Sequence, residues 1–320
     1  MILLLPSFTT LAQPVSPRIN MFKYSPNQQY VAIYQVINPE CGIGSAEILV
    51  VNVATDETIY MFPGHGCDGY VVWSPTGRFL ASTGIDGSIN VWDTAIGTLS
   101  QQFILTWHGV SSLSWRADEA FMVANIGNCT TCFEMYSLAT GVKTTIGTIE
   151  NAGSVAWHPS NNNEIAVSEQ DGVIRVYSAS GEFIREMGEF NSYGLGWSPN
   201  GLYIVTFESA KALIIDSTTG AILHELIVPP LEEYDGFRDL SWSDDNRIIA
   251  LTTDKFLGVW NVSTGELIYQ DTSDYPNYID IRSVGNQYAL SRSVVTTLGY
   301  QEVSLPLLPT LIDDCWQTRR

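Results

Sequence analysis

Catalytic chemistry would need acids, histidines or a nucleophile at suitable spacings, and few residues of this sequence meet that requirement. Ser198 follows Gly196 and Trp197, but the fifth position is Asn200, so the final glycine of a nucleophile elbow is missing. Adjacent acids are typical of solvated turns as well as of acid–base pairs, and such pairs occur at Glu232-Glu233, Asp244-Asp245 and Asp313-Asp314. Neither a phosphate-binding glycine loop nor a metalloprotease helix pattern occurs. The sequence therefore predicts no catalytic residue, no cofactor and no metal site.

The chain is strongly acidic, because 34 acids against 15 bases give it a formal net charge of −19. A nucleic-acid-binding protein needs a basic surface to neutralise phosphates, so this class is disfavoured, and the same sign argues against anionic membrane surfaces. The acidity suits solubility or, alternatively, the binding of a basic partner. No apolar run approaches the length of about 18 residues that a membrane span requires.

One short motif recurs along the chain and indicates its organisation. Residues 72–77 read Val-Trp-Ser-Pro-Thr-Gly and residues 196–201 read Gly-Trp-Ser-Pro-Asn-Gly. Degenerate copies share an aromatic or aliphatic anchor before a turn, and the anchors lie near residues 24, 73, 115, 157, 197, 242 and 281. A spacing of roughly 40–45 residues is typical of four-stranded propeller blades.

The interior of the second repeat shows the expected strand pattern. Asp86-Gly87 stands between the runs Phe79–Thr83 and Ile89–Asp93 and predicts a hairpin turn. The residue before each anchor is mostly small and the one before that is aliphatic, as in Leu113-Ser114. We interpret the small residues as room for close approach where innermost strands converge, and the aliphatic residues as packing between neighbouring blades.

Val91-Trp92-Asp93 and Val259-Trp260-Asn261 resemble the closing dipeptide of the WD-repeat (WD40) family, and Gly64-His65 resembles its opening pair. The resemblance extends from about residue 18 to about residue 300 and is strongest in the second repeat. With the seven anchors, it implies an all-β protein, a seven-bladed β-propeller of four-stranded antiparallel blades. Members of the family mostly serve as interaction platforms, so the resemblance also implies a non-enzymatic, protein-binding role.

The resemblance further implies a structural hydrogen-bond chain in the second repeat, formed by His65, Ser82, Asp86 and Trp92. Such a chain would satisfy polar groups that the blade buries. The alternative is a catalytic His-Asp pair. The other repeats lack the full set, and in the third repeat Tyr136 stands where the chain would need tryptophan.

Five cysteines occur, at positions 41, 67, 129, 132 and 315. Cys129 and Cys132 flank the expected hairpin turn of the third repeat, where cross-strand neighbours come within disulfide range. Cys41 and Cys67 lie in loops that open on one face of a propeller, so these two are a second candidate pair. Unpaired buried thiols and a zinc site are the alternatives. Paired cysteines would favour an extracytoplasmic location; otherwise the sequence fits a cytoplasmic or an extracytoplasmic protein.

We expect a single domain over residues 1–320, with a C-terminal tail at residues 301–320. A propeller must hide the edge of its last blade. Residues 8–12 stand at the offset from Tyr24 that a closing strand requires, whereas the rival segment, residues 303–308, is interrupted by Pro306. Residues 1–12 also resemble a signal peptide that lacks a basic n-region. They are therefore either a closing strand or a signal remnant.

The loops that lead into the innermost strands carry aromatic residues and an arginine, the residue types that dominate the energetics of interfaces. In a propeller these loops share one face around the central channel. The residues of this predicted binding face are Tyr70, Trp107, His108, Phe190, Tyr193, Tyr234, Phe237, Arg238, Tyr275 and Tyr278. We expect about half of them to pack between blades and the others to bind a protein or peptide partner. The alternative function is a propeller enzyme of the lactonase or sugar-processing kind, with acids, histidines or a metal converging at the channel mouth.

Overall fold

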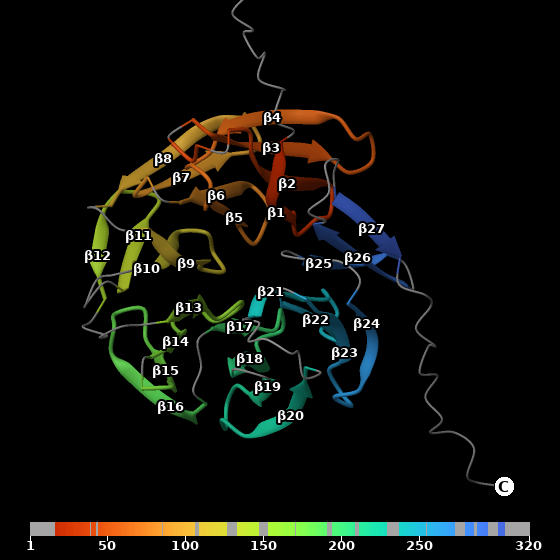
Figure 1. The fold of residues 1–320 in the computed structure, drawn as a ribbon. Coiled ribbons are helices and arrows are strands. Elements are labelled where there is room, and N and C mark those ends of the chain that lie inside the picture. The colour runs from red at the N-terminus through yellow and green to blue at the C-terminus, as the bar shows by residue number, and fades with distance from the viewer. Residues whose placement is uncertain are drawn as a thin grey trace, which may run out of the picture.

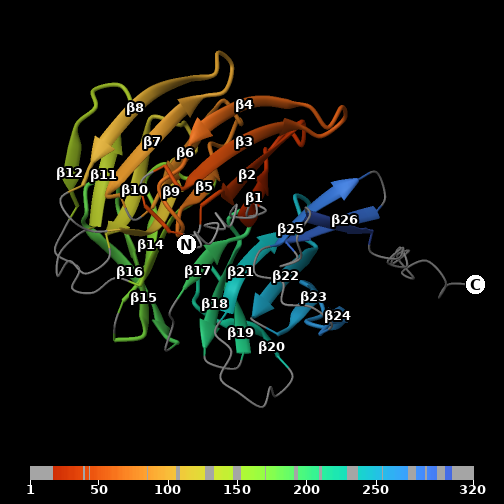
Figure 2. The ribbon, with the colours of Figure 1, turned by 45° about the horizontal axis from the view of Figure 1, so that its top comes forward.

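The protein is a ring of β-sheets. The computed structural model describes residues 17–304 except residues 39, 43, 85, 106–108, 127–132, 147–152, 170, 191–193, 209–210, 229–236, 254, 273–278, 285–286 and 294–299. The described residues form 27 strands in seven antiparallel sheets. The sheets follow one another around the ring in chain order, with the first strand of each nearest the centre (Figure 1). The inclined view in Figure 2 shows the same succession.

Six of the sheets are four-stranded blades, and each is a meander in chain order. Blades 1 and 2 contain β1 (Arg18–Tyr24), β2 (Tyr30–Val36), β3 (Ala46–Asn52), β4 (Thr58–Pro63), β5 (Tyr70–Trp73), β6 (Phe79–Thr83), β7 (Ser88–Asp93) and β8 (Thr98–Ile104). Blades 3 and 4 contain β9 (Val110–Trp115), β10 (Phe121–Ile126), β11 (Phe133–Ser137), β12 (Lys143–Thr145), β13 (Ser154–Trp157), β14 (Ile165–Ser168), β15 (Val173–Tyr177) and β16 (Phe183–Glu189). Blades 5 and 6 contain β17 (Leu195–Trp197), β18 (Tyr203–Glu208), β19 (Lys211–Asp216), β20 (Ile222–Ile227), β21 (Phe237–Trp242), β22 (Ile248–Thr253), β23 (Leu257–Asn261) and β24 (Leu267–Asp271).

The prediction of seven four-stranded blades is wrong. The described residues form six such blades, and the repeat anchored near Ile281 forms a three-stranded sheet of β25 (Ile279–Val284), β26 (Gln287–Ser293) and β27 (Tyr300–Ser304). The spacing of the anchors gives the number of repeats but not the number of strands in each repeat. In the last repeat, Pro306 and Pro309 follow β27 closely in the sequence, and proline has no N–H with which to pair.

Of the two segments predicted to close the ring, the structure describes only a part of one. Residues 8–12 lie outside the described residues. Residues 303 and 304 of the rival segment belong to β27, which pairs with β26, and the remainder of that segment also lies outside the described residues. The predicted tail, residues 301–320, therefore begins within a strand.

The hydrophobic core lies between neighbouring blades, because each blade is apolar on both faces. One buried cluster combines Tyr34 and Ile48 of blade 1 with Trp73 and Leu80 of blade 2. Phe62, on the outer strand of blade 1, stacks on Trp92 of blade 2 with 4.5 Å between ring centroids. Similar clusters join blade 2 to blade 3 and blade 5 to blade 6.

The tryptophan anchors bind the preceding blade through their indole N–H groups. Trp73 Nε1 donates to the carbonyl of Lys23 at 2.8 Å, and Trp115 Nε1 donates to the carbonyl of Val72 at 3.1 Å. Trp197 Nε1 donates in the same way to a carbonyl of blade 4, at 3.1 Å. In each pair the acceptor is the residue just before the preceding anchor. The repeated tryptophan is thus a hydrogen-bond link between blades as well as a core residue.

We expect replacement of Trp115 by phenylalanine to destabilise the protein more than the same replacement of Trp157. Both changes shorten a buried aromatic side chain, but only Trp115 Nε1 has an acceptor; among the described residues Trp157 Nε1 is buried without one. The difference should be about 1–2 kcal/mol, because the carbonyl of Val72 loses its donor. Urea unfolding of the two variants measures it. Equal losses would mean that the indole bonds contribute nothing to stability.

A second set of bonds joins the innermost strands through the residue before the anchor. Ser114 Oγ accepts from the backbone N–H of Trp157 at 2.8 Å, and Ser241 Oγ accepts from that of Ile281 at 3.0 Å. A carboxylate does the same between the three-stranded sheet and blade 1, where Asp280 Oδ2 accepts from the N–H of the Tyr24 anchor at 2.7 Å. This bond lies at the point where the ring closes.

In blades 1, 2, 5 and 6 the serine after the anchor closes the turn between the first two strands. Ser74 Oγ accepts from the N–H of Phe79 at 2.9 Å, and the serines at positions 25, 198 and 243 make the same bond at 3.0 Å. In blade 4 the residue is His158, which packs against Trp197 with 4.5 Å between ring centroids. Its Nδ1 accepts from the N–H groups of residues 160 and 161 at 3.2 and 2.9 Å. Burial lowers the pKa of His158, and these two bonds need the neutral ring.

We expect His158 to make the protein less stable in mild acid. Because its folded pKa is lower than its unfolded pKa, the unfolded chain takes up the proton first as pH falls. The stability that neutral His158 contributes is present above about pH 6.5 and is lost as pH falls through the folded pKa. In urea unfolding between about pH 7.5 and pH 5.5, His158→Ser should lose less unfolding free energy than the wild type. Serine is the matched replacement, since blades 1, 2, 5 and 6 carry it at this place. An equal loss in both proteins would contradict the expectation.

Candidate functional site

The four residues of the predicted hydrogen-bond chain come together in blade 2. His65 Nδ1 lies 2.9 Å from Asp86 Oδ1, and its Nε2 lies 2.8 Å from Ser82 Oγ. Trp92 Nε1 donates to the same Ser82 Oγ at 2.9 Å. Since a carboxylate only accepts, His65 Nδ1 carries a proton in this contact, and in the neutral tautomer with that proton the Ser82 hydroxyl donates to Nε2. This hydrogen-bond chain joins the loop before β5 to the β6–β7 hairpin and to the middle of the blade.

This arrangement leaves no group of His65 for catalysis. The side chain of His65 is 0% exposed and both of its ring nitrogens have partners. Asp86 also accepts from the backbone N–H and the hydroxyl of Ser88, each at 3.0 Å, and so shapes the hairpin turn. The geometry fits a structural link between a loop and a turn rather than an acid–base pair.

Blades 3 and 4 use a tyrosine and a glutamate where blade 2 uses the histidine chain. Tyr136 pairs with Met122 at the place that Trp92 has in blade 2, and its hydroxyl donates to Glu134 Oε2 at 2.6 Å. In blade 4 the hydroxyl of Tyr177 donates to Glu169 Oε1 at 2.6 Å. Burial and the glutamate bond raise the pKa of both tyrosines. We did not foresee these pairs; in blade 3 the signal is a glutamate two residues before the tyrosine, on the same side of β11.

Two sets of loops share one face of the ring, because the strands of each blade alternate in direction. The loops that lead into the innermost strands, such as residues 64–69, emerge at the same edge as the hairpins between second and third strands, such as residues 84–87. We call this the loop face. The Trp-Ser-Pro turns and the turns between third and fourth strands emerge on the opposite side, which we call the turn face.

The structure describes four of the residues predicted for the binding face. Phe190 is buried, Phe237 stacks on Phe207 with 4.6 Å between ring centroids, and Tyr70 packs between two core clusters. Burial of its hydroxyl raises the pKa of Tyr70. Arg238 is exposed. The other predicted residues lie outside the described residues: Trp107, His108, Tyr193, Tyr234, Tyr275 and Tyr278.

The acids of the innermost strands are engaged by neighbouring strands. Asp239, on β21, accepts from Lys23 Nζ at 2.9 Å and from the N–H of Ile279 at 3.0 Å. Asp280, on β25, accepts from the hydroxyl of Ser241 at 2.7 Å and from the N–H of Tyr24. Burial raises the pKa of Asp280, an effect that the nearby Lys23 ammonium opposes. These carboxylates link three sheets.

Among the described residues, neither a metal centre nor a membrane-spanning helix is found. Within this part of the chain, no group of three or more His, Cys, Asp or Glu side chains is placed to hold a metal ion. The same residues include no helix of the length and hydropathy that a membrane span requires.

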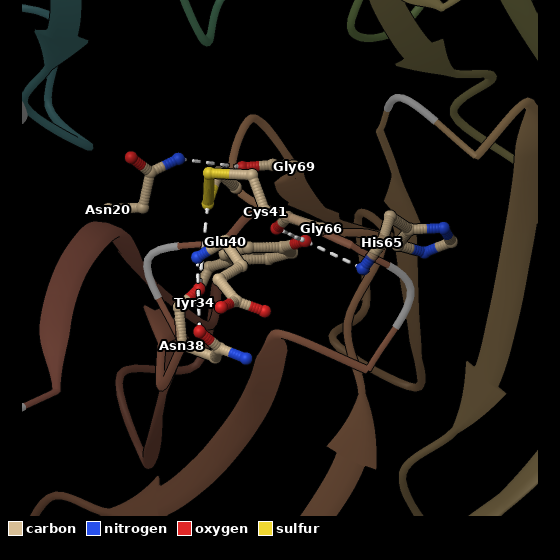
Figure 3. Close-up of a disulfide and its surroundings, with 9 residues drawn as sticks. Asn20, Tyr34, Asn38, Glu40, Cys41, His65, Gly66 and Gly69 are labelled. Carbon is tan, nitrogen blue, oxygen red and sulfur yellow. Dashed lines mark hydrogen bonds between the residues drawn. A yellow bond between two sulfur atoms is a disulfide. The ribbon is translucent and has the colours of Figure 1, made fainter. Parts of the chain in front are cut away.

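A disulfide joins Cys41 to Cys67 across the loop face (Figure 3). Cys41 belongs to the β2–β3 hairpin of blade 1, and Cys67 belongs to the loop between blades 1 and 2. The Cα atoms of the two residues are 4.8 Å apart. The other candidate pair, Cys129 and Cys132, lies outside the described residues, as does Cys315.

Comparisons with known proteins match this architecture. The family model described as "WD domain, G-beta repeat" matches residues 56–93, the stretch that contains the histidine chain of blade 2. A Drosophila melanogaster protein named Actin-interacting protein 1 is 23% identical over 276 residues, which are 81% of this chain and 45% of that protein. The chain thus spans about half the length of the curated relative that it matches. The crystal structure of the β-propeller domain of Myceliophteria thermophila Cps50 (Swd1) covers 90% of this chain and 96% of that domain, with a TM-score of 0.74 at 12% identity.

Proposed function

We propose that this chain, a WD-repeat β-propeller, is a non-enzymatic scaffold that binds a protein or peptide partner on its loop face. WD-repeat propellers typically serve as platforms for protein interactions, and the match over residues 56–93 together with the propeller fold confirms the resemblance. The partner and the binding face are the parts of this proposal that need an experiment.

The observation that carries the proposal is the contrast between the buried polar groups and the loop face. Three described groups that could do chemistry are used inside the fold: His65 is enclosed in its hydrogen-bond chain, and Asp239 and Asp280 hold neighbouring strands together. The loop face, in contrast, exposes Asp68 and Arg238 around the ring centre. Arginine is enriched at protein interfaces, and the net charge of −19 favours a basic partner.

The test is affinity capture from the source cells by the wild type and by two double variants of unchanged net charge. Asp68→Lys with Arg238→Glu reverses two exposed charges of the loop face. Arg247→Glu with Glu266→Lys does the same to two exposed charges of the turn face and is the matched control. We expect the loop-face variant to lose partner capture by about tenfold or more and the control to retain it.

Circular dichroism of each variant, matched to the wild type, excludes unfolding as the cause. Undiminished capture by a folded loop-face variant would contradict the proposed face. Actin is the first purified partner to assay, because the Drosophila relative is named for interacting with actin, and the same pair of variants applies to it.

A further inference from the structure

Residues 37–45, of which all but 39 and 43 are described, form the β2–β3 hairpin loop of blade 1 and are tied covalently to the body of the protein; we call them the tethered loop. Ile37 is 39% exposed, and Asn38, Glu40 and Cys41 are also exposed. A Cβ added to Gly42 or to Gly44 would meet no atom within 4 Å. These described positions therefore project from the blade, whereas Ser45, at the base of the loop, is buried.

The backbone of the tethered loop folds largely on itself. The N–H groups of Ile37 and Asn38 donate to the carbonyl of Ser45, and the N–H of Ser45 donates to the carbonyl of Gly42. Cys41 has a φ of 56°, a left-handed conformation that non-glycine residues rarely adopt. Local backbone strain of this kind persists when the surrounding structure imposes it, and here the disulfide to Cys67 joins Cys41 to the body.

The other end of the disulfide lies in a loop that has its own supports. Cys67 is 4% exposed. On one side of it, the carbonyl of Gly66 accepts from the hydroxyl of Tyr34 at 2.8 Å, and His65 belongs to the blade 2 chain. On the other side, the carbonyl of Gly69 accepts from Asn20 Nδ2 at 3.1 Å (Figure 3). Residues 65–69 thus keep several hydrogen bonds when the disulfide is broken.

We propose that the Cys41–Cys67 disulfide is a redox-operated tether: reduction releases the tethered loop from the loop face and leaves residues 65–69 in place. Cys41 is exposed and Cys67 is buried, so an external thiolate meets the disulfide from the side of Cys41. A thiolate of an external dithiol bonds to Cys41 Sγ, the bond between the two cysteines breaks, and Cys67 leaves as a thiolate that takes up a proton. The second thiol of the reductant then displaces Cys41, so that the reductant becomes a disulfide and the protein a dithiol.

The device concerns the conformation of the chain itself, so it goes beyond the proposed function and its test needs no partner. In the test, the folded double variant Cys129→Ser/Cys132→Ser is treated with dithiothreitol in the absence of denaturant. The two substitutions remove the other candidate disulfide from the readout. Trapping with iodoacetamide and peptide mapping reports the state of Cys41 and Cys67. Hydrogen–deuterium exchange before and after reduction reports the two loops separately.

We expect reduction in the folded state, with exchange in residues 37–45 faster by about tenfold and exchange in residues 65–69 changed by less than about twofold. Cys41→Ser with Cys67→Ala should reproduce the reduced pattern without any reductant. A disulfide that yields to dithiothreitol only after the protein unfolds would overturn the proposal. Equal loosening of both loops would also overturn it, since the bond would then be a structural support of blade 2.

Discussion

Replacing His65 by alanine is expected to lower the free energy of unfolding by about 3–5 kcal/mol. The change removes a fully buried ring and leaves the buried hydroxyl of Ser82 without its histidine partner, whereas Asp86, which is exposed, keeps its two bonds from Ser88. The cost of unpaired groups in a buried network exceeds that of a single surface bond, because water cannot replace the lost partner. Urea unfolding, followed by intrinsic tryptophan fluorescence, measures the loss.

The control for this prediction is His224→Ala, which removes a half-buried histidine from the outer strand β20. We expect it to cost less than about 1.5 kcal/mol. A similarly small cost for His65→Ala would mean that the hydrogen-bond chain in blade 2 does not stabilise the fold. The interpretation of this hydrogen-bond chain as a structural link would then be wrong.

Replacing Asp280 by alanine is expected to cost about 2–4 kcal/mol. The carboxylate of Asp280 accepts from the N–H of Tyr24 in blade 1 and from the hydroxyl of Ser241 in blade 6, so the change leaves two donors unsatisfied where the ring closes. Lys23 keeps its ion pair with Asp239, at 2.9 Å. The loss therefore reflects the two missing acceptor contacts rather than an unpaired ammonium.

A matched control for the ring closure is Asp244→Ala. Asp244 also joins blades 6 and 1, through Gln28 Nε2, but it is exposed on the turn face. We expect a cost below about 1 kcal/mol, since water replaces an exposed partner readily. Equal costs for the two aspartates would contradict the view that Asp280 holds the closure of the ring.

The architecture was largely predictable from the sequence, since the anchors recur with the period of a propeller blade. Strand number was not, because the last repeat has Ile281 in place of tryptophan and prolines soon after β27, and anchor spacing is insensitive to both. The family resemblance placed His65, Ser82, Asp86 and Trp92 in one chain, and the structure brings these four residues together.

The contacts between blades were predicted only in part. We interpreted small residues before the anchors as room for close packing, yet Ser114 and Ser241 also supply an oxygen to the next blade's N–H groups. Strand alternation gives the side on which such a residue lies and not the partner that it meets, which depends on how neighbouring blades are placed. The sequence does contain one signal of these contacts, an oxygen-bearing side chain before the anchor: a serine before two anchors (Ser114 and Ser241) and a carboxylate before a third (Asp280).

The most direct measurement of the proposed function is hydrogen–deuterium exchange of the chain with its captured partner bound. We expect slower exchange in the loop-face segments around Asp68 and Asp86 and in the strand that begins at Phe237, with unchanged exchange in the turn-face segments 74–78 and 93–97. Protection confined to the turn face, or to the outer strands at the rim of the ring, would contradict a scaffold that binds through its loop face.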